Sequence, residues 1–84
     1  MAKYKKAVGL EYDQNGDRAP LVNLKGEALL AEHIVKIAHR YGVPVVENSE
    51  LACALHKVEL DEEIPKSLFE PIAIVLRHLK SVFR

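Results

Sequence analysis

The hydrophobic period changes along this chain, and that change most limits the folds open to 84 residues. From Lys6 to Tyr12 apolar side chains alternate, with Val8 and Leu10 on one face, and this period of two predicts a strand. A second short strand is predicted over 20–24. The residues between them, 13–17, favour turn conformations. The two strands are therefore expected to form a hairpin.

The next segment has a helical period. Lys25 and Gly26 predict the end of the second strand, and Gly42 is typical of the C-terminal end of a helix. Between them one stripe recurs at helical spacing: Leu30, Ile34, Ile37, Ala38 and Tyr41. Residues 43–46 (Val-Pro-Val-Val) predict a third strand. Pro44 lacks an N–H group, which indicates a strand start or a sheet edge.

The last third of the chain predicts two further helices. One runs from Glu50 to about His56, with Asn48 or Ser49 as its cap. The other begins near Pro65 and continues to the C-terminus. Pro71 falls inside that pattern and is expected to kink the helix or to split off its first turn.

The predicted order is β-β-α-β-α-α, and the fold class is α/β of the mixed α+β kind. We expect a small three-stranded mixed sheet covered by three helices. The second strand, the first helix and the third strand should form a right-handed crossover. Residues 1–84 should make a single domain, with residues 1–5 as a flexible basic tail.

Composition narrows the function classes. Twelve Lys and Arg residues balance twelve Asp and Glu residues, which argues against a chain built mainly to bind nucleic acid or an anionic membrane. One cysteine cannot form an intramolecular disulfide. No apolar run approaches the roughly 20 residues of a membrane span, and none follows the N-terminal lysines as in a signal peptide. The expectation is a soluble, cytoplasmic domain without direct membrane insertion.

Few residues could carry chemistry. His33 and His39 are six apart and fall on different helix faces. Cys53 and His56 are three apart on a predicted helix and could meet, but two ligands do not make a metal site. We expect no metal, no cofactor and no catalytic residue. Cys53 is predicted to be a small buried apolar residue, with His56 at a helix end.

Other readings remain open. Cys53 with His56 as its base would suit a small α/β enzyme or ligand-binding domain. Lys3, Lys5 and Lys6 would suit a nucleic-acid-binding module with a basic N-terminal tail, although aromatic residues beyond Tyr4 are missing there. The consecutive carboxylates Asp61, Glu62 and Glu63 are expected to be a solvated run before a helix rather than an acid–base pair.

Several short segments, taken in order, resemble one family. It is the cytoplasmic C-terminal domain of FlhB and its YscU-type relatives, the substrate-specificity switch proteins of flagellar and virulence type III export. The resemblance covers about residues 5–83 and rests on the order and spacing of its pieces. These are Ala7-Val8-Gly9-Leu10-Glu11-Tyr12-Asp13, Ala19-Pro20-Leu21-Val22, Lys25-Gly26, Val43-Pro44-Val45-Val46-Glu47-Asn48, Leu51-Ala52-Cys53-Ala54-Leu55 and Glu63-Ile64-Pro65.

One departure bears on activity. Family members that switch carry Asn-Pro-Thr-His just before the first of these segments and cleave themselves after that Asn. Here the corresponding residues are Ala2, Lys3, Tyr4 and Lys5, so the attacking Asn side chain is absent. The family's membrane domain is absent as well. The chain therefore resembles the free-standing FlhB-like (FlhX-type) proteins, and no self-cleavage is expected.

The resemblance also implies a function. It implies a non-enzymatic component of type III protein export that binds export substrates, the ruler protein or the export gate, with no nucleic acid as partner. Its location would be cytoplasmic, peripheral to the export apparatus at the inner face of the membrane. The family's apolar substrate patch maps onto Ala19, Pro20, Ala52 and Leu55. The family's sheet has a further strand that this chain is expected to lack, which would leave a sheet edge open. Either another polypeptide, such as the N-terminal part of a true FlhB, supplies that strand, or Lys5, Lys6 and the N-terminus protect the edge.

Overall fold

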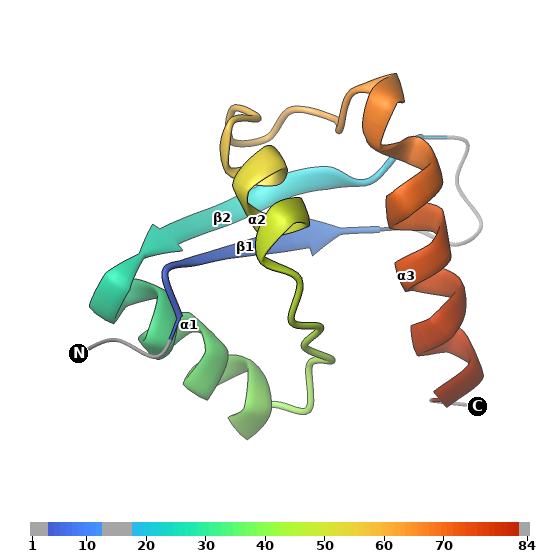
Figure 1. Ribbon diagram of the computed structural model, residues 1–84. Coiled ribbons are helices and arrows are strands. Elements are labelled where there is room, and N and C mark those ends of the chain that lie inside the picture. The colour runs from blue at the N-terminus through green and yellow to red at the C-terminus, as the bar shows by residue number, and fades with distance from the viewer. Residues whose placement is uncertain (1–3, 13–17, 83–84) are drawn as a thin grey trace.

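The computed structural model describes residues 4–12 and 18–82, and Figure 1 shows their arrangement. A hairpin of β1 (Lys6–Glu11) and β2 (Leu21–Glu27) is followed by α1 (Ala28–Arg40) and α2 (Ser49–His56). A 3₁₀ turn (Lys66–Leu68) then leads into α3 (Phe69–Val82). The predicted mixed α+β class with three helices is confirmed.

The predicted three-stranded sheet is wrong. The described part of the chain forms a two-stranded antiparallel sheet, and residues 43–48 are coil. The Val43 N–H group donates to the Ala38 carbonyl at the end of α1, and Pro44 has no N–H to donate. Among residues 4–12 and 18–82 no strand pairs with this segment, so its strand propensity produces no ladder and no crossover forms.

The predicted break at Lys25 and Gly26 is also wrong, because β2 continues to Glu27. Gly26 is buried under α1. A Cβ atom at this position would lie 2.7 Å from Ile34 Cδ1 and 2.8 Å from Leu30 Cγ. The glycine therefore allows α1 to pack directly on the strand instead of ending it.

The two faces of the hairpin carry separate apolar clusters, because successive strand residues point to opposite faces. Ala7 packs with Ala31 and Val35 of α1. The other face holds the larger cluster, whose buried members are Val22, Leu55, Ile64 and Ile72. This second cluster joins α2 and α3 to the sheet.

The outer edge of β2 is covered at its start. The Val22 N–H group donates to the Glu62 carbonyl (3.0 Å), and the Asp61 N–H group donates to the Val22 carbonyl (2.7 Å). The Ile64 N–H group donates to the Pro20 carbonyl (2.9 Å). The segment 61–64 thus protects this edge, while its carboxylates remain exposed as predicted.

The start of the last helix follows the prediction for Pro71. Residues 66–68 form a 3₁₀ turn that directly precedes α3 instead of a first α-helical turn, and Pro71 lies in the first turn of α3. A proline is tolerated there because N–H groups in the first turn have no partner within the helix.

Candidate functional site

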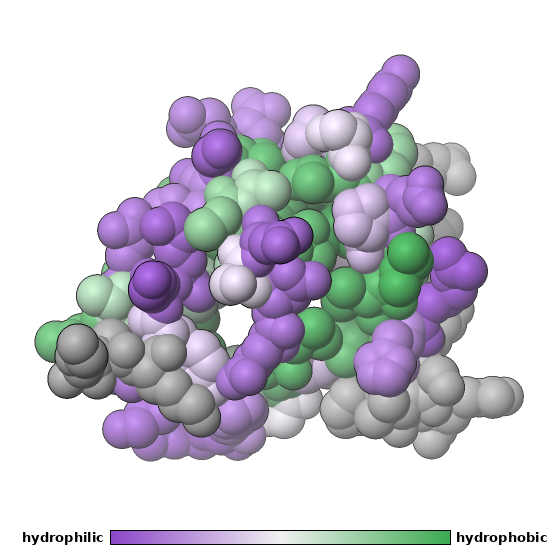
Figure 2. Space-filling view, in the orientation of Figure 1, coloured by the Kyte–Doolittle hydropathy of each residue, from purple (hydrophilic) through white to green (hydrophobic). Residues whose placement is uncertain are grey.

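A large open cavity is the main candidate site. Its volume is about 2220 Å³, and it is lined by residues of β1, α1, the 43–48 segment, α2 and α3. In the space-filling view an opening passes between the sheet and the 43–48 segment (Figure 2). Pockets for drug-sized molecules usually measure about 300–1,000 Å³, so this cavity better matches part of a polypeptide. We call it the cleft.

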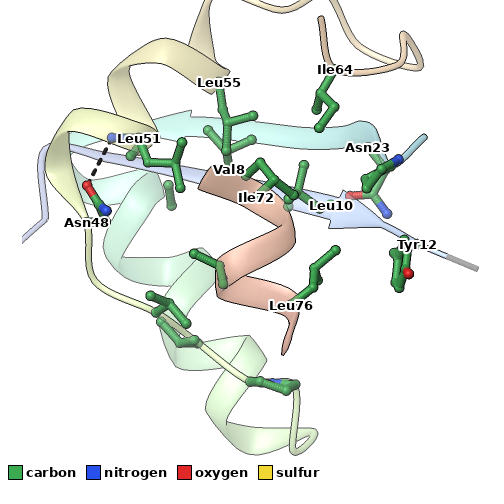
Figure 3. Close-up of a pocket in the computed structure, with 18 of the residues that line it drawn as sticks. Val8, Leu10, Tyr12, Asn23, Asn48, Leu51, Leu55, Ile64, Ile72 and Leu76 are labelled. Carbon is green, nitrogen blue, oxygen red and sulfur yellow. Dashed lines mark hydrogen bonds between the residues drawn. The ribbon is translucent and has the colours of Figure 1, made fainter. Parts of the chain in front are cut away.

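Apolar side chains of three elements point into the upper part of the cleft (Figure 3). Val8 and Leu10 come from β1, Leu51 from α2, and Leu76 from α3, and all four are half-buried. They pack against the larger apolar cluster while remaining part of the cleft wall. A partner inserted here would extend a core that is already formed.

The four residues of the predicted substrate patch all line the cleft. Ala19 and Ala52 are half-buried, whereas Pro20 is buried and Leu55 is only 5% exposed. Leu55 is therefore a core residue of the wall, and Ala19 and Ala52 offer the accessible surface. Ala19 and Pro20 come from the residues just before β2, and Ala52 and Leu55 come from α2, so the structure brings two distant segments into one cavity.

Asn48 caps α2, as predicted, by accepting from the Leu51 N–H group at 3.1 Å (Figure 3). Three further interactions hold the end of α2 against β2. The Lys25 ammonium group of β2 donates to the His56 and Val58 carbonyls at 3.2 and 2.9 Å. His56 Nε2 lies 3.4 Å from Glu27 Oε1. The position of Ala52 in the cleft thus depends on β2 as well as on the core.

The rim of the cleft carries large apolar side chains that are at least 40% exposed. They are Tyr12, Ile37, Tyr41, Val43, Val46 and Phe69. The sequence did not predict this feature, because Ile37 and Tyr41 were placed on one helical stripe and Val43 and Val46 in a strand. The signal that could have found it is the continuation of apolar residues on both sides of Gly42.

The alternative site at Cys53 is not assembled in the structure. Cys53 is exposed, so its predicted burial is wrong. It lies on the side of α2 that lines the open cleft, where no other described element covers it. His56 is the last residue of α2, as predicted, and it faces Glu27 rather than the thiol. Among the described residues, no group of three or more His, Cys, Asp or Glu side chains could hold a metal ion.

The residues at the position of the cleavage motif are described in part. Ala2 and Lys3 lie outside the described residues. Tyr4 is half-buried against the Ala7 cluster, and the Lys5 carbonyl accepts from the Ala28 N–H group at 3.0 Å. Across residues 4–12 and 18–82, no helix has the length and apolar character that a membrane span requires.

Comparison with known proteins gives the same family. The profile of the "FlhB HrpN YscU SpaS Family" matches residues 4–79. "Uncharacterized protein YlqH" of Bacillus subtilis is 38% identical over 69 residues, which are 82% of this chain and 74% of YlqH. The "Secretion system apparatus protein SsaU" of Salmonella typhimurium is 44% identical over 77 residues, 90% of this chain but 22% of SsaU. The "Flagellar biosynthetic protein FlhB" of Aquifex aeolicus is 38% identical over 74 residues, 87% of this chain and 21% of FlhB.

Solved structures agree in fold. The crystal structure of the PscU C-terminal domain has a TM-score of 0.82 and 36% identity, covering 89% of this chain and 96% of that domain. A mutated EscU/SpaS C-terminal domain has a TM-score of 0.81 and 32% identity, covering 87% of this chain and 89% of that one. The match to a family profile over most of the chain, together with these structures, shows that the chain belongs to the FlhB HrpN YscU SpaS family.

Proposed function

We propose that this chain is a non-enzymatic component of type III protein export that binds proteins of the export apparatus or its substrates through the cleft. The observation that carries the proposal is the family match over residues 4–79, joined to a large, open and mainly apolar cavity. Relatives named for flagellar biosynthesis and for a secretion system apparatus support an export role. We propose a cytoplasmic location at the apparatus.

The accessible contact surface in this proposal is formed by Ala19 and Ala52, with Pro20 and Leu55 as the packed floor beneath them. Small side chains at Ala19 and Ala52 leave room for an apolar group of the partner. The export substrates, the ruler protein and the export gate are the candidate partners.

We also propose that the chain does not cleave itself. Asn-Pro-Thr-His is replaced by Ala2, Lys3, Tyr4 and Lys5, which offer no amide side chain to attack the main chain. Intact-mass spectrometry of the purified protein should give the uncut chain. A product that begins at any residue from Lys3 to Lys6 would contradict this part of the proposal.

Complementation tests the export role. In a strain that lacks the FlhB cytoplasmic fragment, this chain should restore measurable export of a reporter substrate. Ala52→Glu places a charge in the cleft and should abolish that export. Ala54→Glu makes the same change on the same helix at a position outside the cleft lining, and should retain it. Equal export by both variants would refute a role for the cleft.

Cys53→Ala separates the export role from the alternative of a thiol-dependent enzyme. The Cys53 thiol is exposed and His56 faces Glu27, so we expect this substitution to leave export unchanged. Loss of export by a folded Cys53→Ala protein would instead favour chemistry at the thiol.

A further inference from the structure

The outer side of α1 carries apolar side chains that the rest of the described chain leaves exposed. The helix buries Ala31 and Val35 against the hairpin. On its outer side, Leu29 is 73% exposed and Leu30 is 53% exposed. Neither leucine lines the cleft, so this surface extends beyond the site described above. A single exposed leucine is ordinary, but a contiguous patch of exposed apolar side chains marks a surface that meets a partner.

The exposed apolar side chains follow one line along the helix. Leu30, Ile37 and Tyr41 recur at helical spacing, which places them on the same side of α1. Ile37 and Tyr41 reach the rim of the cleft, and Tyr41 is 75% exposed at the end of the helix. A tyrosine side chain, with an apolar ring and a polar hydroxyl group, favours the boundary between lipid and water.

A basic line runs beside the apolar one. Leu29 is followed at helical spacing by His33, Lys36 and Arg40, and all four side chains are exposed. Residues 33–46 contain no aspartate and no glutamate. The exposed side of α1 therefore combines apolar side chains with positive charge.

A run of acidic residues lies far from this surface. The segment 59–63 has four exposed carboxylates and lies at the opposite end of the molecule from α1 (Figure 1). Of the acidic residues close to α1, Glu32 is half-buried and Glu27 Oε1 lies 3.4 Å from His56 Nε2. The balanced net charge of the chain thus conceals an uneven distribution. An anionic surface would attract α1 and repel the opposite end of the molecule.

The chemistry of this surface favours a lipid layer over a protein partner. The exposed side of a helix is convex, and the two leucines lie outside the cleft, so they offer no groove for a folded segment. Lysine is depleted at the cores of protein interfaces. Helices that lie on membranes instead combine leucine with lysine and arginine. The long stems of Lys36 and Arg40 can follow the apolar surface while their charges reach lipid phosphates.

We propose that α1 lies flat on an anionic lipid surface. Leu29, Leu30 and Tyr41 enter the boundary between the headgroups and the acyl chains, and Lys36 and Arg40 contact lipid phosphates. The helix lies in the plane of the surface and does not cross it. The acidic segment 59–63 then points away from the lipid. The inference goes beyond the proposed function, because this contact needs no export protein.

The test is sedimentation of the whole chain with lipid vesicles. Vesicles of equal parts phosphatidylglycerol and phosphatidylcholine should bind the chain saturably at low ionic strength. Binding should weaken at least about tenfold when the salt is raised to about 0.5 M, because salt screens the lipid charge. Free inorganic phosphate at the same concentration as the lipid should not displace the chain, since it offers no apolar layer. No binding to these vesicles, or equal binding to vesicles of phosphatidylcholine alone, would overturn the inference.

Two double variants locate the charged contact. Lys36→Glu with Arg40→Glu reverses the basic line and should weaken vesicle binding at least about tenfold. Lys57→Glu with Lys66→Glu makes the same change in net charge at exposed positions outside α1 and should stay within about threefold of the unchanged chain. Far-UV circular dichroism checks that both variants fold. If the two double variants bind equally, net charge rather than α1 controls binding, and the inference is wrong.

A pair of leucine variants tests the apolar contact. Leu29→Gln keeps a good helix former at an exposed position and should weaken vesicle binding at least about fivefold, because the side chain no longer enters the lipid. Leu60 is 52% exposed in the acidic segment at the opposite end of the molecule, so Leu60→Gln should bind as the unchanged chain does. Equal binding by these two variants would exclude insertion of α1 into the lipid.

Discussion

Removal of the Lys25 ammonium group should weaken the attachment of α2 to the sheet. Lys25 is half-buried, and its Nζ donates to the carbonyl of His56, the last residue of α2, at 3.2 Å and to the carbonyl of Val58, two residues beyond the helix, at 2.9 Å. Carbonyl groups at a helix end have no partner within the helix and carry partial negative charge. Lys25→Met keeps the length and packing of the side chain and removes the charge and both bonds.

The size of the effect follows from these contacts. A hydrogen bond to a charged group contributes about 1.5–3 kcal/mol, and a cation at a helix C-terminus adds about 0.3–1 kcal/mol. One ammonium serves both carbonyls and is only half-buried, so we expect a loss of about 2 kcal/mol in the free energy of unfolding. In a domain of this size that loss lowers Tm by roughly 8–16 °C.

Thermal and urea unfolding followed by far-UV circular dichroism measure this loss. Lys66→Met is the matched control, because Lys66 is exposed on the 3₁₀ turn and its replacement should change stability by less than about 0.5 kcal/mol. Hydrogen exchange in α2 should rise more than in α1 for the Lys25 variant. Unfolding midpoints that are the same for the two variants would refute the reasoning.

Two further predictions concern stability. Ile72→Ala should lower the free energy of unfolding, measured in urea, by about 2–5 kcal/mol, because Ile72 is 2% exposed in the larger cluster. Ile74 is 55% exposed on the same helix, so Ile74→Ala should lower it far less. Equal losses for the two variants would contradict the assignment of the core. Ala28 has a φ of 53° at the start of α1, a left-handed conformation that costs an alanine about 1–2 kcal/mol. Ala28→Gly should therefore stabilise the chain. The gain should reach up to about 1 kcal/mol once the greater conformational entropy that glycine loses on folding is subtracted. An unchanged or lower Tm would show that the left-handed conformation of Ala28 does not destabilise the chain.

Local patterns predicted most of the elements. The period of two in β1, the helical period of α1, the Asn48 cap and the effect of Pro71 agree with the structure. The buried residues of α1, however, are Ala31 and Val35 rather than members of the predicted stripe. These features depend on a residue and its near neighbours, so a sequence is enough to predict them. The resemblance, resting on the order of short segments, likewise found the family.

Predictions that depended on distant contacts were less successful. Whether Gly26 ends a strand depends on Leu30 and Ile34 packing over it, and no local pattern contains that contact. Cys53 lies among apolar neighbours in the sequence, yet it is exposed at the open cleft. Burial of one helix face is decided by what the rest of the chain places against it.

The candidate site shows the same division. The apolar character of Ala19, Pro20, Ala52 and Leu55 is evident from the sequence, and the family resemblance predicts their grouping in one patch. Packing of the chain makes Leu55 a core residue and leaves Ala19 and Ala52 accessible. Packing also explains why residues 43–46 stay coil despite a sequence that favours a strand. A strand forms only when a neighbour accepts its hydrogen bonds, and here the neighbouring space is the cleft.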